Sequence, residues 1–206
     1  PHDGRAYFEG TYRLVNDTGA PVSELHVVFQ DGRTEITSLE IPNSTLTLDE
    51  EEQFGYQIYT LDPALAPDDT MEMSFTSERV HSAFSTRGED TRLVKNGTFL
   101  NNAEFAPQLG FDRSALLQDR STRRKYDLPA ELRMPKLEDE AARDRNYVGN
   151  ADWVMADITV TTRADQVPIA PGKLVSDTTD GDRRTARFQS QNPILAFFSI
   201  QSADYA

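Results

Sequence analysis

The sequence contains no cysteine, and this absence excludes several kinds of chemistry at once. Disulfide scaffolds, thiolate zinc sites, iron–sulfur centres and cysteine nucleophiles all need a residue that the chain does not have. Histidine is scarce, and the three histidines, His2, His26 and His81, do not have the spacing of two metal ligands on one helix. The P-loop, the dinucleotide-binding G-x-G-x-x-G and the hydrolase G-x-S-x-G are also absent. These absences leave no recognisable catalytic motif in the chain.

The chain also has few positively charged residues and no long apolar run. Lys plus Arg number 21 against 34 Asp plus Glu, which gives a net charge of −13. Such a balance repels phosphate backbones and anionic headgroups, so we expect no nucleic-acid partner. No apolar run reaches the roughly 18 residues of a membrane-spanning helix, so we expect no direct membrane insertion by this chain.

The 206 residues are enough for one substantial core, and we predict a single domain over 1–206. Turn residues divide the first 80 residues into short segments with alternating apolar side chains. In the segment 6–16, Phe8, Tyr12 and Leu14 share a face with Gly10, which marks a small or bulged position. Further strands are predicted near 25–29, 36–41, 53–61 and 71–75, with turns at 31–32 and 42–43 and a loop bracketed by 62–63 and 67–69. This spacing predicts a mainly β fold, an antiparallel sandwich or saddle-shaped sheet.

The middle of the chain has a different character. We predict a charged helical or loop insertion at about 112–150, with a helix over 113–125 capped by Asp112 and a second over 137–145. The last third returns to strands at 153–162, 183–189 and 193–202, with a bend at 169–172. The segment 193–202 (PILAFFSIQS) is apolar on both faces. Such a strand is usually central in a sheet or covered by a neighbouring domain.

Each candidate for chemistry has an ordinary structural explanation. The acidic runs point their carboxylates in different directions, unlike a calcium loop, and we interpret them as solvated turns. We interpret His26 and His81 as solvent-facing or edge residues, and the basic cluster as a helix face neutralised by neighbouring aspartates. Three Asn-x-Ser/Thr sequons coincide with residues that turns require. The acidic runs are 49–52, 68–69 and 180–182, the basic residues are Arg120, Arg123, Arg124 and Lys125, and the sequons begin at Asn16, Asn43 and Asn96.

Several strings in a fixed order resemble a known family. They are the strand 6–16, the segments 96–99, 107–111 and 152–153, the strand 158–162 and the bend 166–172, followed by 193–199. Together they resemble the N-terminal β-domain of bacterial membrane proteins that join an ABC-type permease region to an aminopeptidase-like zinc metallopeptidase module. The closing segment resembles the strand that ends this domain in alanyl-aminopeptidase-like gluzincins.

The resemblance implies a saddle-shaped β-sandwich that precedes a thermolysin-like domain, within a fragment of a polytopic parent protein. It implies that this chain is not itself an enzyme, with no catalytic, cofactor-binding or metal-binding residue, and that zinc belongs to the missing peptidase-like domain. The H-E-x-x-H motif of that domain is absent here. The implied partners are that domain and the transmembrane region of the same protein. The implied location is the extracytoplasmic, periplasmic face of the bacterial inner membrane.

One departure from the family bears on activity. In soluble aminopeptidases this domain contributes a Gln-x-Glu pair that holds the free amine of the substrate. The matching region, 98–104, has no such pair, and Glu104 is its nearest carboxylate. The departure argues against amine anchoring of the aminopeptidase kind.

Two other functions remain open from the residues alone. A free-standing carbohydrate- or protein-binding module would present Tyr7, Phe8, Tyr56 and Tyr59 as a flat aromatic platform. A carboxylate-based hydrolase would need two acids facing each other in a cleft, one with its pKa raised by burial. The first requires exposed, coplanar rings and the second a deep acidic cleft.

Overall fold

Alternating side chains build the first sheet, as the sequence predicts. In a computed structural model, which describes residues 4–29, 32–50, 55–80, 91–111, 116–129, 136, 138–140 and 152–205, sheet A has the strand order β1-β6-β3. The strands are β1 (Arg5–Val15), β6 (Thr70–Val80) and β3 (Thr34–Glu40). Tyr12 and Phe75 pack on the inner face. Gly10 lies opposite Phe75, and a Cβ there would be 2.5 Å from Cε1 of that ring, which explains the small residue.

Sheet B has the order β4-β5-β2-β9 and differs from the prediction in two places. Its strands are β4 (Ser44–Glu50), β5 (Tyr56–Leu65), β2 (Val22–Val28) and β9 (Gln108–Leu109). Strand β4 was not predicted, so Asp49 and Glu50 lie at a strand end and not in a turn. The loop predicted between 62–63 and 67–69 is also shorter than expected, because it begins only after Leu65. Strand β5 continues through Pro63, because Asp62 N still donates to Asn43 O at 2.8 Å on the neighbouring chain segment.

Asn16 connects two neighbouring chain segments: the loop between β1 and β2, and the end of β5 before the turn to β6. Its Nδ2 donates to the carbonyls of Ala20 (2.8 Å) and Leu65 (2.9 Å), and its Oδ1 accepts from Thr18 N and Oγ1. The residue is only 4% exposed. Asn16 is therefore a buried structural joint, unlike Asn43 and Asn96, whose side chains are exposed.

The second half forms two further sheets that pack face to face. Sheet C has the order β12-β16-β8-β7, and sheet D has the order β11-β14-β13. A core of Ala170, Ala186 and Phe188 packs against Ile158, Val160 and Ile200, which come from both sheets. The strands are β7 (Leu93–Val94), β8 (Gly97–Asn101), β11 (Asp157–Arg163), β12 (Val167–Ile169), β13 (Lys173–Asp180), β14 (Arg183–Gln189) and β16 (Ser199–Ala203).

Several elements of the second half differ from the prediction. Strand β13 was not predicted, whereas β14 and the turn at Gly181 (φ 57°) were. The strand predicted over 153–162 is broken into β10 (Trp153–Val154) and β11, because Ala156 N turns aside to Ser190 Oγ at 2.8 Å. The strand predicted over 193–202 is likewise broken into β15 (Ile194–Leu195) and β16.

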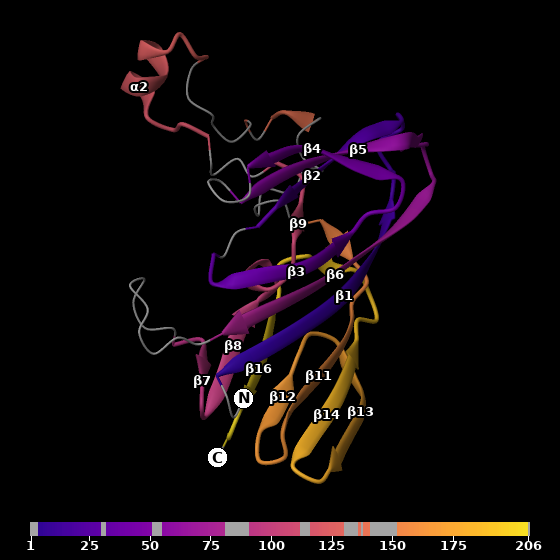
Figure 1. The fold of residues 1–206 in the computed structure, drawn as a ribbon, viewed down its shortest axis with the longest axis vertical. Helices are drawn as coiled ribbons and strands as arrows, with labels where there is room; N and C mark the ends of the chain where they lie inside the picture. Colours follow the sequence, from indigo (N-terminus) through magenta and orange to yellow (C-terminus); the bar gives the residue numbers. More distant parts are fainter. Residues whose placement is uncertain are drawn as a thin grey trace.

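The helical content is small. Helix α2 (Arg120–Lys125) begins eight residues after the predicted Asp112 cap, because Asp119 accepts from Thr122 N at 2.7 Å and caps it instead. A 3-10 turn, η1 (Asn102–Glu104), is also present. Most of the helix predicted over 137–145 lies outside the described residues. The mainly β antiparallel fold is confirmed. Figure 1 shows the long strands of sheet A crossing in front of β8 and β16, with α2 at a distance from the sheets.

Candidate interaction surface

Three highly exposed apolar side chains of the second half lie on or next to a two-stranded ribbon. Strands β10 and β15 pair antiparallel, with Trp153 opposite Leu195. Met155 follows the end of β10 and Phe197 follows the end of β15, two residues beyond Trp153 and Leu195 respectively. Trp153 is 64% exposed, Met155 63% and Phe197 60%. We call Trp153, Met155, Leu195 and Phe197 the apolar ribbon patch.

Hydrogen bonds fix the backbone under this patch. Ala196 N donates to Asp152 O at 2.7 Å, and Asp152 Oδ1 accepts from Trp153 N at 2.7 Å. Asn102 binds the other side: its Nδ2 donates to Ala196 O at 2.8 Å and its Oδ1 accepts from Phe198 N at 3.1 Å. The patch is therefore presented on an ordered backbone, which reduces the entropy cost of binding.

The patch bears directly on the prediction for the segment 193–202. Its last part, β16, is a central strand between β12 and β8, but the segment as a whole is split at 196–198 and leaves Phe197 exposed. The alternative, that a neighbouring domain covers it, stays a prediction.

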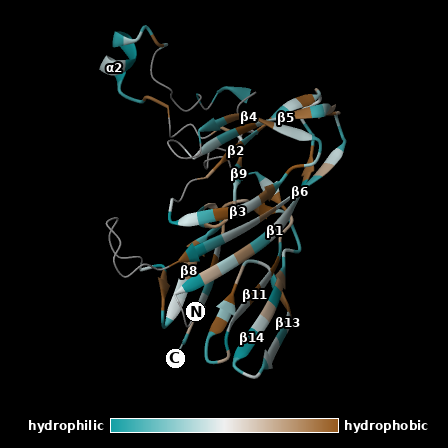
Figure 2. Cartoon of the chain, viewed as in Figure 1, coloured by the Kyte–Doolittle hydropathy of each residue, from teal (hydrophilic) through white to brown (hydrophobic). Residues whose placement is uncertain are grey.

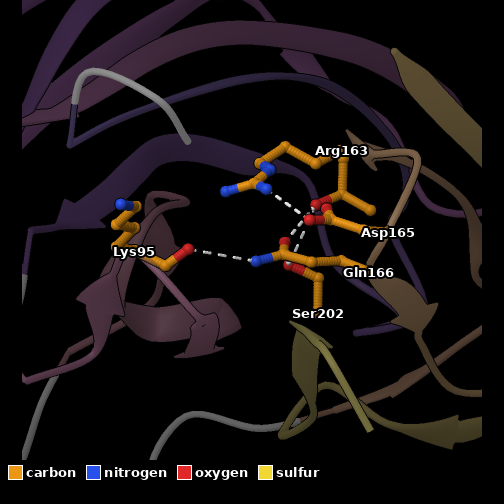
Figure 3. Close-up of polar contacts among 6 residues, drawn as sticks. Lys95, Arg163, Asp165, Gln166 and Ser202 are labelled. Atoms are coloured by element: carbon orange, nitrogen blue, oxygen red, sulfur yellow. Dashed lines mark hydrogen bonds and ion pairs between the residues drawn. The ribbon is translucent and has the colours of Figure 1, made fainter. Parts of the chain in front are cut away.

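A buried polar cluster joins two strands and two turns of the sandwich. Gln166 is 1% exposed and its Oε1 accepts from Thr162 Oγ1 (2.6 Å) and Ser202 Oγ (3.1 Å). Figure 3 shows the Gln166 amide pointing at the carbonyl of Lys95, 3.3 Å away, in the turn between β7 and β8. Arg163 and Asp165 form an ion pair at the edge of this group. With its partners satisfied inside the fold, the cluster is a structural connection between β11, β16, the turn that precedes β12 and the turn between β7 and β8.

The acidic runs and histidines are ordinary surface features where the structure describes them. Among the described residues no group of three or more His, Cys, Asp or Glu is placed to hold a metal ion. His81, Glu51 and Glu52 lie outside the described residues. Asp68 and Asp69 lie in the turn before β6, as predicted.

His26 is more connected than the sequence indicates. It is half-buried on β2, where its Nδ1 lies against the Tyr56 hydroxyl of β5 and its Nε2 is 3.9 Å from Glu24 Oε2. Burial and the Glu24 charge raise the pKa of Tyr56. Sequence reasoning missed this pair because its members are 30 residues apart and meet only through the β2–β5 register.

Glu104 has a structural role. Its Oε2 accepts from Asn101 N at 2.8 Å, closing the capping box of η1, and its Oε1 contacts the Arg92 guanidinium. Only 12% of the Glu104 side chain is exposed. A carboxylate held in this way by the domain's own backbone and arginine is not placed to anchor a substrate amine.

The four rings proposed for a sugar platform face different ways. Tyr7 and Phe8 are neighbours on β1 and point to opposite faces; Tyr7 is 69% exposed, whereas Phe8 stacks on Phe105 at 4.6 Å. Tyr56 packs edge-on against Phe111, and Tyr59, on the other face of sheet B, donates to Gln57 Oε1 at 2.9 Å. The rings do not form one flat platform.

An open groove of about 680 Å³ lies between the outer face of sheet A and strand β11. It includes the carboxylates of Glu9, Glu40 and Asp157, separated by hydroxyl side chains. Hydrogen bonds from Arg187 and Gln189 lower the pKa of Asp157 to about 2, the reverse of what a general acid requires. The groove therefore lacks the property that a carboxylate hydrolase needs of this residue.

One basic residue of α2, Arg123, does not belong to an exposed cationic surface. Arg123 is buried, and its Nε and Nη1 donate to the carbonyls of Pro129 (2.9 Å) and Leu117 (2.7 Å). Lys125 Nζ lies 5.7 Å from the centre of the Tyr126 ring. The interpretation that aspartates neutralise this face is wrong for Arg123, whose donors go to main-chain carbonyls, and for Asp119, whose carboxylate caps the helix.

Figure 2 shows hydrophobic (brown) and hydrophilic (teal) residues interspersed along the strands. Among the described residues, no helix has both the length and the apolar character needed to cross a membrane.

Comparisons with known proteins identify the fold. No protein-family profile matches the chain, and no curated protein matches its sequence. Solved structures do match: the M1 zinc metallopeptidase of Deinococcus radiodurans aligns with a TM-score of 0.54 at 10% identity, over 98% of this chain and 38% of the other. A mutant of that enzyme bound to a Tyr-Ser-Ala substrate gives 0.53 at 11% identity, over 98% and 39%. A two-domain M1 zinc metallopeptidase mutant bound to L-arginine gives 0.52 at 12%, over 98% and 39%.

This chain thus spans about two fifths of the length of these peptidase chains. At such low identity the likeness establishes the fold, and it confirms the fold that the sequence resemblance implies.

Proposed function

We propose that this chain is a non-catalytic N-terminal β-domain that packs on a zinc-peptidase-like domain of the same protein and helps to shape its site. The observation that carries the proposal is the match over 98% of this chain to peptidase chains of which it covers only 38–39%. One of these is described as having two domains. The remainder of such a chain is the natural place for the zinc and the catalytic residues.

The properties of the described residues support a catalytic site that lies in another domain. Zinc hydrolysis needs three protein ligands and a bound water, and the described residues bring no such ligand set together. The carboxylate nearest to the amine-anchoring position, Glu104, is engaged in a helix cap and an ion pair. Any peptidase activity of the whole protein would therefore not rely on this residue to hold the substrate amine.

The test is a zinc and activity measurement on two proteins. We expect the full-length protein to hold about one zinc per chain by elemental analysis and to cleave peptides. We expect residues 1–206 alone to hold none and cleave nothing. Stoichiometric zinc in residues 1–206, or a full-length protein that neither binds zinc nor contains H-E-x-x-H, would overturn the proposal.

The finer proposal concerns the parent protein. From the sequence strings we infer that it is a membrane protein with an ABC-type permease region, and that this domain lies on the extracytoplasmic, periplasmic face. The support is the resemblance of those strings in order. Protease added to intact spheroplasts should cleave this domain if it lies outside, whereas cleavage only after lysis, or recovery of the protein in the soluble fraction, would contradict the inference.

A further inference from the structure

We propose that the apolar ribbon patch is the anchor by which this domain docks on the peptidase-like domain. This inference rests on the function proposed above and adds the surface that makes the contact. Its members, Trp153, Met155, Leu195 and Phe197, come from two chain segments that the β10–β15 pairing brings together.

Exposure distinguishes the patch from an ordinary surface. Isolated apolar residues on a surface need no explanation, whereas here three large exposed side chains lie on or within two residues of one strand pair, as at an interaction site. Three of the four members are at least 60% exposed, and a tryptophan and a phenylalanine are among them. Aromatic residues of this kind supply most of the binding energy in protein interfaces.

Charge supports an apolar protein partner. The whole chain carries a net charge of −13, yet none of the four patch members is ionisable. The outer face of sheet A contrasts with it, because Glu9, Glu40 and Glu72 lie there. A partner that lies on the ribbon side buries apolar area and leaves most of the carboxylates in water, which avoids a desolvation penalty.

The backbone beneath the patch is suited to an anchor. The Asn102 side chain, Asp152 and Ser190 hold the ribbon on both sides. A preorganised patch loses little conformational entropy when it is covered. The fold match supplies the occupant, since the matched peptidase chains are about two and a half times as long as the part that this chain covers.

The experiment uses cysteine labelling in the full-length protein. Residues 1–206 contain no cysteine, so one can be placed at Met155 (M155C) and, as a matched control, at Tyr7 (Y7C) on the outer face of sheet A. The two side chains are similarly exposed in this domain, at 63% and 69%. If the patch is covered, M155C reacts with a maleimide about tenfold more slowly than Y7C in the native protein, and equally fast in denaturant. The labelled peptide is quantified by mass spectrometry.

Equal rates of maleimide labelling for the two cysteines in the native protein would overturn the inference. F197C provides a second position if M155C does not fold. If the protein binds zinc and M155C is unprotected, the docking surface is wrong and the proposed function stands. If M155C is protected in a protein without zinc or H-E-x-x-H, the proposed function fails and the patch has another occupant, which contradicts this inference too.

Discussion

At the residue scale, individual polar side chains hold the corners of the fold. Asn16 satisfies two carbonyls and accepts from the nitrogen and hydroxyl of Thr18, all from a nearly buried position. Removing such a side chain leaves the part-buried carbonyl of Leu65 without this donor, and an unmade bond costs more than the bond itself contributes.

We therefore expect Asn16→Ala to lower the free energy of unfolding by about 2–4 kcal/mol, measured by urea denaturation. Asn96→Ala, at an exposed turn, is the control and should change it by less than about 0.5 kcal/mol. Equal effects of the two substitutions would contradict the role assigned to Asn16.

Asp157 gives a pH-dependent prediction. Its pKa is lowered to about 2 from an ordinary 3.8, first by the hydrogen bond from Arg187 and then by that from Gln189. A group with a lowered folded pKa stabilises the protein above its unfolded pKa and loses that contribution as the pH falls toward its folded value. The window is therefore about pH 4 down to pH 2.

We expect the urea midpoint of Asp157→Asn to lie below that of the unsubstituted chain at pH 6. The difference between the two urea midpoints should become smaller as the pH falls from 4 to 2. Asp182→Asn, in the turn between β13 and β14, is the control and should show no such narrowing. A gap at Asp157 that is constant across this range would show that the ion pair does not contribute.

At the element scale, the alternation of side chains predicts which strands form but not where they are interrupted. The face of Phe8, Tyr12 and Leu14 and the strand 183–189 are confirmed. The breaks at 155–156 and 196–198 come from partners distant in sequence, Ser190 and Asn102, which no local pattern contains. Every residue of strand β13 is exposed, so no alternation of apolar side chains in the sequence predicts this strand.

The buried cluster gives a prediction at this scale because it joins separate strands. The hydroxyls of Thr162 and Ser202 both reach Gln166 Oε1, so substitutions at the two positions should not be additive. We expect a coupling energy of at least about 0.5 kcal/mol in a double-mutant cycle of Thr162→Val and Ser202→Ala, measured by urea denaturation.

The matched control is the hydroxyl pair of Thr161 and Thr185, 3.0 Å apart on the exposed face of the same sheet. The double-mutant cycle of Thr161→Val and Thr185→Val should give a smaller coupling energy than the cycle of Thr162→Val and Ser202→Ala. Additive effects at Thr162 and Ser202 would show that the cluster does not act as a unit.

At the scale of the whole molecule, the chain is a set of packed antiparallel sheets whose described residues carry no assembled catalytic centre. The fold class follows from periodicity and turn chemistry, and it agrees with the solved peptidase structures. The patch could be predicted only in part: the apolar segment 193–199 is visible in the sequence, but its partner Trp153 is not, since their proximity depends on the β10–β15 pairing.

The central claim is that the reactive centre belongs to a neighbouring domain seated on this one. The most direct measurement is photo-crosslinking from a benzoyl-phenylalanine placed at Phe197 in the full-length protein, with the same probe at Tyr7 as the control. The account predicts crosslinks from Phe197 to peptides of the domain that carries H-E-x-x-H, and few or none from Tyr7. Crosslinks from Phe197 that stay within residues 1–206, or an equal yield from Tyr7, would contradict it.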